Sequence, residues 1–186
     1  MDDLRVISGI THVLKRGLQW RDTPKEYGPC KTLYNRFSGQ SVKKGDVPRA
    51  IGRTKGGLNS KLHAVCDGTG RPVVMLLSQG QMSDYKGAKL LFETLPTAPV
   101  FLADRGYDAD WFREALRRKG IEPCIPPRKN RKIDIPYDKT IYKQRHRIEN
   151  MFAKLKDWRR IATRYDRCAH TFFSTICIAS IVIWWL

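Results

Sequence analysis

The stretch PVFLAD (residues 99–104) says most about the fold of this chain. Its first five residues form a short, wholly apolar run, which is typical of a strand buried in the middle of a sheet. The run stops at Asp104, where the chain must leave the sheet. Because α/β sheets place their ligands beyond the carboxyl ends of their strands, Asp104 is a candidate site residue. A capping or turn role for this aspartate is the alternative.

The segments around this run alternate between strand and helix patterns. Two apolar runs, 61–66 and 72–77, flank the turn DGTG (residues 67–70), which predicts a hairpin. A helix capped by Ser83 is expected next, then a helix over 108–119, a strand near 121–125 and a long helix over 138–158. This order predicts an α/β fold with a mixed sheet flanked by helices.

The two ends of the chain read as helical. Apolar residues at helical spacing predict a helix over 4–14 that stops at Gly17, and a second short helix carries Leu33, Tyr34 and Phe37. This pair fits a helix-turn-helix remnant or a plain packing hairpin equally. The polar, glycine-rich stretch 38–60 predicts a loop. The apolar segment 171–186 is shorter than the roughly 18 to 20 residues that span a membrane, which favours a buried last helix over an anchor.

The charge balance points to a polyanionic partner. Lysine and arginine number 35 against 18 acidic residues, a net charge of +17, while 41% of the residues are hydrophobic. Nucleic acid is the leading partner, and a merely basic soluble protein or an RNA binder is the alternative. Five cysteines without a C-x-x-C pair indicate neither a zinc site nor a disulfide framework. The start of the chain lacks a signal-peptide pattern, so a cytoplasmic, nucleoid-associated protein without membrane contact is expected.

Four polar residues share one stripe of the long predicted helix. With Tyr142 at 0° and about 100° per residue, Arg145, Glu149 and Lys156 fall at about −60°, −20° and −40°. The apolar residues Ile148, Met151, Phe152 and Leu155 form a neighbouring stripe that faces the core. The polar stripe therefore suits the floor of a cleft. An exposed ion pair between Arg145 and Glu149 explains the spacing equally well.

This spacing, Y-x2-R-x3-E-x6-K, resembles the signature of insertion-sequence transposases, which are bacterial members of the DDE superfamily. The segments LADRGYDAD, LSQGQMSDY and IPPRKNRK are similar to the same family, above all to its insertion-sequence four/five superfamily. The resemblance covers nearly the whole chain. It implies a ribonuclease-H-like fold and DNA transposition, in which strands are cleaved and joined.

The resemblance also implies roles for individual residues. Asp104 and Glu149 would be catalytic carboxylates and ligands of two Mg²⁺ (or Mn²⁺) ions, since hard cations prefer carboxylate oxygens. The two carboxylates should then lie close together. Tyr142, Arg145 and Lys156 would hold DNA phosphates beside the metal. The basic loop residues Arg128, Lys129, Arg131 and Lys132 would contact the DNA backbone.

One carboxylate of the family pattern is missing from this chain. The family's first aspartate ends a central strand ahead of the glycine-rich segment 52–57, and no such strand is predicted here. The only acidic residue between Glu26 and Asp67 is Asp46, which follows lysines rather than an apolar run. Asp67 lies in the hairpin turn and Asp84 at a helix start, so neither replaces it convincingly. An internal deletion between about 37 and 43 and a truncated N-terminus are the simplest interpretation.

Three segments and two functional hypotheses follow from these patterns. The segments are a helical part (residues 1–40), a basic linker (41–60) and a partial catalytic domain (61–186). The first hypothesis is an insertion-sequence transposase impaired in catalysis. The second is a non-catalytic DNA-binding remnant that inhibits an intact transposase. Either would bind the terminal inverted repeats of its element, as a homodimer and without a small-molecule substrate.

Overall fold

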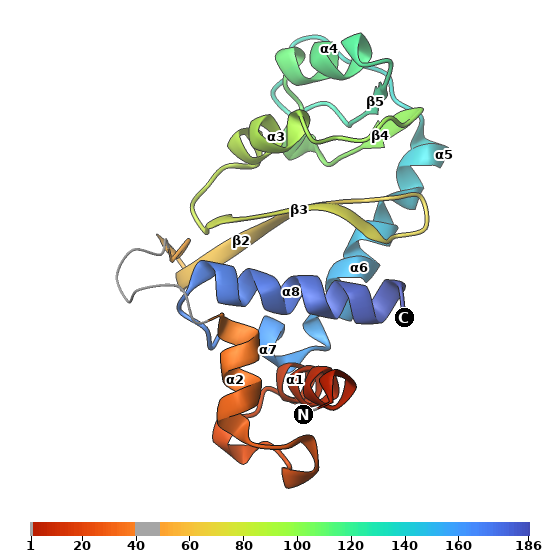
Figure 1. The fold of residues 1–186 in the computed structure, drawn as a ribbon. Coiled ribbons are helices and arrows are strands. Elements are labelled where there is room, and N and C mark those ends of the chain that lie inside the picture. Colours follow the sequence, from red (N-terminus) through yellow and green to blue (C-terminus); the bar gives the residue numbers. More distant parts are fainter. Residues whose placement is uncertain (1, 40–48) are drawn as a thin grey trace. The chain divides into compact units, whose positions relative to one another are not determined.

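The computed structural model describes residues 2–39 and 49–186. The chain divides into two compact units (Figure 1). The first contains residues 1–51 and 151–186, and the second contains residues 52–150. The first unit is therefore built from both ends of the chain.

The second unit contains two small sheets. Strands β1 (Gly52–Thr54), β2 (Gly57–Cys66) and β3 (Pro72–Gln79) form an antiparallel sheet in the order β1-β2-β3. Strands β4 (Val100–Leu102) and β5 (Glu122–Cys124) pair in parallel, with Val100 opposite Glu122. The hairpin turn predicted over 67–70 joins β2 to β3, with a hydrogen bond from the Gly70 N–H to the Asp67 carbonyl. The strands run in both directions, as predicted.

Helices pack on the strands β4 and β5. Helix α3 (Asp84–Phe92) begins at the predicted cap Ser83, whose hydroxyl accepts the Lys86 N–H, and α4 (Asp110–Arg118) follows the short 3-10 helix η3 (Arg105–Tyr107). The apolar faces of α3 and α4 and the residues that follow β4 and precede or follow β5 form one hydrophobic core. Its buried members are Ala88, Ala103, Phe112, Leu116, Ile121 and Ile125. This core fixes the point where β4 ends.

The predicted long helix is interrupted. Instead of one helix over 138–158, the chain forms α5 (Lys139–Tyr142), the 3-10 turn η4 (Lys143–Arg145) and α6 (His146–Lys156). Helix α5 begins where Asp138 accepts the N–H groups of Thr140 and Ile141. A 3-10 turn winds more tightly than an α-helix, so the uniform 100° per residue does not hold between Tyr142 and Arg145.

The polar stretch predicted as a loop is partly a hairpin. Residues 40–48, with most of the predicted deletion site, lie outside the described residues, but β1 and the start of β2 occupy 52–60. Gly57 has a φ of +100°, which favours glycine in the tight turn, and the Thr54 hydroxyl donates to its carbonyl. Because Leu58 is exposed, this hairpin lacks the apolar alternation that marks a half-buried strand.

The first unit is helical. Helix α1 (Asp3–Arg16) ends at Gly17, which has the left-handed φ of 67° expected of a helix stop. Two 3-10 helices, η1 (Trp20–Asp22) and η2 (Lys25–Tyr27), occupy the segment before α2 (Cys30–Ser38). Helices α7 (Arg159–Ala162) and α8 (Ala169–Trp184) both contact α1.

The last helix is packed rather than free. Phe172, Ile176 and Ala179 of α8 are buried, and α8 contacts α1 and α7. Among the described residues, none of the helices has the length and apolarity needed to cross a membrane. The prediction of a buried last helix is therefore confirmed for α8.

The predicted α/β fold is confirmed by this mixture of strands and helices. The described strands form two sheets rather than one, since β2 and β4 have no strand between them in the described part of the chain. The loss of a first central strand stays a prediction, and so does the division into segments 1–40, 41–60 and 61–186.

Candidate functional site

Asp104 lies just beyond the end of β4. It caps η3, where its Oδ1 accepts the Gly106 N–H at 2.8 Å, and its side chain is exposed. The capping role that the sequence left open is therefore present. The cap uses only Oδ1 of the Asp104 carboxylate, because Oδ2 accepts no hydrogen bond from the described residues. Asp104 can thus cap the turn and still present an oxygen to a ligand.

A second carboxylate, that of Asp84, lies near Asp104. A methyl group added at Gly106 would lie 2.9 Å from Asp104 Oδ1 and 3.4 Å from Asp84 Oδ2. Asp84 is held by Lys61, whose Nζ is 3.0 Å from Asp84 Oδ1 and 3.0 Å from the Met82 carbonyl oxygen. Burial raises the pKa of Tyr107, and the charges of Asp84 and Asp104 raise it further. Sequence reasoning discounted Asp84 because it stands at a helix start, and the packing of α3 against η3 brings it here.

Tyr142 connects this cluster to the polar stripe. Burial raises the pKa of Tyr142, the positive charge of Arg145 lowers it, and the negative charge of Asp104 raises it. The Arg145 guanidinium lies 6.0 Å from the centre of the Tyr142 ring. The charges of Arg145 and Asp104 therefore act on this tyrosine in opposite directions.

Glu149 is engaged by Arg145. An Arg145 nitrogen lies 2.5 Å from Glu149 Oε1, so the ion pair considered from the spacing is present. Lys156 ends the same helix, α6, but belongs to the first unit. Arg145 thus lies near both Tyr142 and Glu149, whereas a shared ligand of Asp104 and Glu149 stays a prediction.

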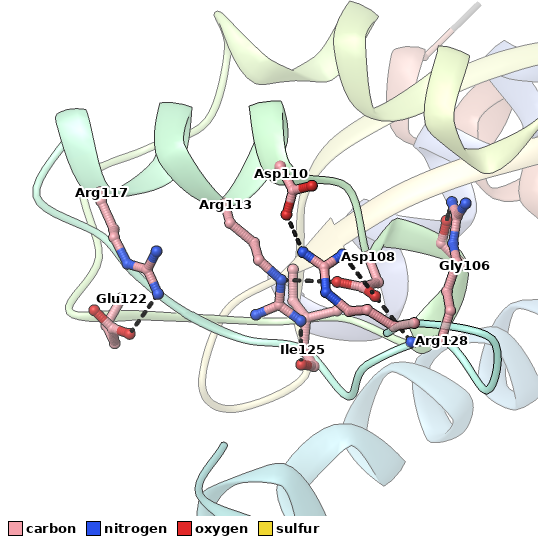
Figure 2. A network of polar contacts seen from close by, with 9 residues as sticks. Gly106, Asp108, Asp110, Arg113, Arg117, Glu122, Ile125 and Arg128 are labelled. Atoms are coloured by element: carbon pink, nitrogen blue, oxygen red, sulfur yellow. Dashed lines mark hydrogen bonds and ion pairs between the residues drawn. The ribbon is translucent and has the colours of Figure 1, made fainter. Parts of the chain in front are cut away.

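The basic loop is anchored by the buried carboxylate of Asp108. Figure 2 shows Asp108 between Arg113 and Arg128. Asp108 Oδ1 accepts from Arg113 Nε at 2.8 Å, and Oδ2 accepts the Arg128 N–H at 2.8 Å. Burial raises the pKa of Asp108, but these hydrogen bonds and the charges of Arg113 and Arg131 outweigh it and lower the pKa below its ordinary value. Sequence reasoning missed this residue because its partners lie in two segments that are distant from each other in the sequence, α4 and the basic loop.

The four predicted DNA-contact residues of this loop differ in whether their side chains are already bonded within the protein. Arg131 bonds to Asp108 and Asp110, and the Arg128 guanidinium donates to the Gly106 carbonyl at 3.2 Å. Lys129 and Lys132 are exposed and form no ion pair with any described residue. The two lysines are therefore the residues of the loop most available to a phosphate.

The other acidic residues considered as substitutes do not join the cluster. Asp46 lies outside the described residues. Asp67 closes its own turn, where Oδ1 accepts the N–H groups of Thr69 and Arg71. Within residues 2–39 and 49–186, no group of three or more His, Cys, Asp or Glu side chains could hold a metal ion.

Comparisons with known proteins identify the class. The family model described as "Transposase DDE domain" matches residues 40–183, and the one described as "Putative transposase of IS4/5 family" matches residues 1–44. The chain therefore belongs to the insertion-sequence transposases with a DDE domain.

Two curated proteins are similar to the chain over most of its length. It is 33% identical over 129 residues to "Putative transposase for insertion sequence element IS6501" of Brucella ovis, covering 68% of this chain and 98% of that protein. It is 30% identical over 156 residues to "Putative transposase for insertion sequence element IS402" of Burkholderia cepacia, covering 74% and 72%. No solved structure matches the chain.

Proposed function

We propose that this insertion-sequence transposase binds the ends of its element through the basic loop and the Tyr142, Arg145 and Lys156 stripe. Support comes from Lys129 and Lys132, which are exposed and not engaged in ion pairs with described residues. The net charge of +17 favours a polyanion. Phosphate contacts of this kind hold a protein on DNA without reading its sequence. Association with the nucleoid and a homodimeric state belong to the same proposal.

The family implies two divalent ions, which Asp104 and Glu149 would hold. The described residues do not fit that set well, because they bring only Asp84 and Asp104 close to one another and form no group of three or more possible ligands.

Impaired catalysis is the second part of the proposal, and one observation carries it. Within residues 2–39 and 49–186, no group of three or more His, Cys, Asp or Glu side chains lies close enough to hold a metal ion, although Asp84 lies near Asp104. Two-metal phosphoryl transfer uses carboxylates to clamp both ions, and removal of one is expected to slow the reaction by orders of magnitude. The chain should therefore bind DNA far better than it cleaves it.

A cleavage assay tests both parts. The purified chain is mixed with DNA carrying the terminal repeats, with Mg²⁺ or Mn²⁺, and bound, nicked and joined DNA are measured. We expect binding without products. Robust cleavage lost in Asp104→Ala would contradict the impairment. Loss in Asp84→Asn as well would assign the missing ligand to Asp84.

The alternative function is inhibition of an intact transposase. It is favoured by the contrast between a firmly anchored basic loop and a metal-donor set that is incomplete in residues 2–39 and 49–186. Adding the chain to an intact relative and its DNA should then reduce strand transfer in proportion to the sites occupied. The variant Lys129→Ala/Lys132→Ala should inhibit less if the inhibition works through DNA.

A further inference from the structure

A polar pocket of about 340 Å³ lies beside the basic loop of the second unit. Its walls come from the start of α3, from the residues around the start of α4 and from the basic loop. They carry Tyr85, Asp108, Asp110, Arg128, Asn130 and Arg131. Ligand pockets in proteins have volumes of about 300–1,000 Å³, so this Tyr85 pocket suits one planar group of a larger ligand.

One wall of the Tyr85 pocket is an aromatic ring that is supported from behind. Tyr85 is 43% exposed, and its ring meets the Trp111 ring edge-on, with centroids 5.1 Å apart and an angle of 76° between the planes. Trp111 in turn packs against the hydrophobic core of α3 and α4. A tyrosine held in this way offers a surface on which a planar ring can stack, and every nucleobase has such a face.

The charged groups of the pocket balance one another. Two carboxylates, those of Asp108 and Asp110, accompany the guanidinium groups of Arg128 and Arg131. The Arg131 guanidinium is bonded to both carboxylates. A phosphate in the pocket would lie beside Asp110, whose side chain is 84% exposed. Because like charges repel, the pocket favours a neutral polar ring, and phosphates are left to the exposed lysines of the loop.

The pocket offers one strong acceptor and two donors. Among the described residues, Asp110 Oδ2 accepts no hydrogen bond and the Asn130 amide forms none. The Arg128 guanidinium donates to the Gly106 carbonyl and has further N–H groups. A carboxylate only accepts, so it selects a ring with adjacent donors. Of the DNA bases, guanine alone has two neighbouring donors, N1–H and the N2 amino group, on the edge that also carries the acceptor O6.

The pocket is connected to Asp104 through Gly106. Arg128 of the pocket donates to the Gly106 carbonyl at 3.2 Å, and the Gly106 N–H donates to Asp104 Oδ1 at 2.8 Å. A DNA strand with a phosphate at Asp104 therefore has a neighbouring base within reach of the pocket. That base must be unpaired, because pairing occupies the edge that faces Asp110 in this arrangement.

We propose that the Tyr85 pocket binds an unpaired guanine base of the DNA strand. The base stacks on Tyr85, donates its N1–H and N2–H groups to the Asp110 carboxylate and accepts at O6 from the Asn130 amide. The proposal rests on the proposed function, because the basic loop holds the strand that supplies the guanine. It adds a base-specific contact to phosphate contacts that carry no sequence information.

Binding of short duplexes with a single unpaired 3′ nucleotide tests the proposal. Fluorescein-labelled duplexes that end in unpaired guanine, adenine or hypoxanthine, and a blunt duplex, are titrated with the full chain without divalent metal, and fluorescence anisotropy is measured. We expect the guanine end to bind about tenfold more tightly than the adenine end, because both bases stack but only guanine fits the acceptor. Hypoxanthine lacks the N2 amino group, so its affinity should fall between them.

Variants of the pocket locate the preference. Tyr85→Ala should weaken both unpaired ends about fivefold or more, since stacking on an aromatic ring contributes to the binding of every base, and Tyr85→Phe should not. Its control is Tyr165→Ala, which removes a tyrosine of similar exposure from the first unit. Asp110→Asn should bring the guanine and adenine ends to within about twofold of each other, because an amide replaces the acceptor. Glu114→Gln removes another exposed carboxylate of α4 and should keep the preference.

Salt dependence separates this inference from the proposed function. Stacking is not ionic, so Tyr85→Ala should leave the slope of log K against log salt unchanged, whereas Lys129→Ala/Lys132→Ala should reduce the slope and keep the guanine preference. A guanine preference without the lysine effect would contradict the proposed function alone. The lysine effect without a guanine preference would contradict this inference alone.

Three results would overturn the inference. Equal affinity for the guanine and adenine ends would show that the pocket does not distinguish the bases. A preference that survives both Tyr85→Ala and Asp110→Asn would place the guanine elsewhere. Competition by free guanosine monophosphate in the same assay, without any preference among the DNA ends, would assign the pocket to a free nucleotide instead of a DNA strand.

Discussion

Two arginine–carboxylate pairs in the second unit have the same chemistry and opposite settings. Arg113 Nε lies 2.8 Å from Asp108, and the two side chains are 3% and 0% exposed. An Arg145 nitrogen lies 2.5 Å from Glu149, with side chains 33% and 57% exposed. The first pair is tied further to Ile125 and Arg128, whereas no second partner holds Glu149 among the described residues.

The comparison distinguishes a buried ion pair that stabilises the fold from a half-exposed ion pair that a ligand can reach. A buried carboxylate that loses its partner leaves an uncompensated ion, so the Asp108 network holds the loop and α4 together. A half-exposed pair is screened by water and can exchange its partner for a ligand at little cost. The Arg145 pair is therefore the better candidate for contact with DNA.

The largest expected effect is the loss of the buried carboxylate. Asp108→Ala leaves Arg113 buried without its partner, which should lower the free energy of unfolding by about 3–5 kcal/mol. Urea denaturation followed by circular dichroism measures it, with Glu149→Ala as the matched variant. Equal destabilisation by the two variants would mean that burial does not distinguish the pairs.

Substitutions in the basic loop should have two different effects, depending on whether the side chain is already bonded within the protein. Lys129→Ala and Lys132→Ala should each lower DNA affinity and reduce the slope of log K against log salt by about one per lost phosphate contact, with unchanged stability. Arg131→Ala should instead lower stability, because its guanidinium bonds to Asp108 and Asp110. Fluorescence anisotropy at several salt concentrations tests this, and an unchanged slope in both lysine variants would exclude them as contacts.

His63 should make the second unit sensitive to acid. Burial lowers its pKa below 6.5, Lys61 lowers it further, and Asp84 opposes this. Because the unfolded chain binds the proton first, this stabilisation is complete above about pH 6.5 and is lost as the pH falls toward the folded pKa. Unfolding free energies between pH 7.5 and 5 in the natural chain and in His63→Asn measure the effect. The same pH slope in both would contradict it.

The smallest effect concerns the exposed pair. Arg145→Ala should change the unfolding free energy by less than about 1 kcal/mol, since half-exposed ion pairs contribute little. The same variant should weaken DNA binding if the stripe holds phosphates. Its control is Arg118→Ala, which removes an exposed pair of the same i,i+4 spacing with Glu114 on α4. Equal DNA binding by the two variants would remove Arg145 from the interface.

Local patterns predicted much of what the structure contains. The apolar run at 100–102, the stop at Gly17, the cap at Ser83 and the turn after Asp67 all follow from neighbouring residues, and each is present. Helix periodicity also placed Arg145 within reach of Glu149. These features depend on backbone conformation and short-range hydrogen bonds, which a sequence expresses directly.

Tertiary structure alone decided the rest. The position of Asp84 near Asp104 depends on how α3 packs, and the environment of Asp108 depends on arginines from two segments, α4 and the basic loop. The ion pairs of Arg131 and the exposed hairpin of β1 and β2 correspond to no local pattern in the sequence. The physical reason is that charge pairing and strand pairing are energies of contact between distant residues, whereas spacing in the sequence reports only what lies within a turn or two.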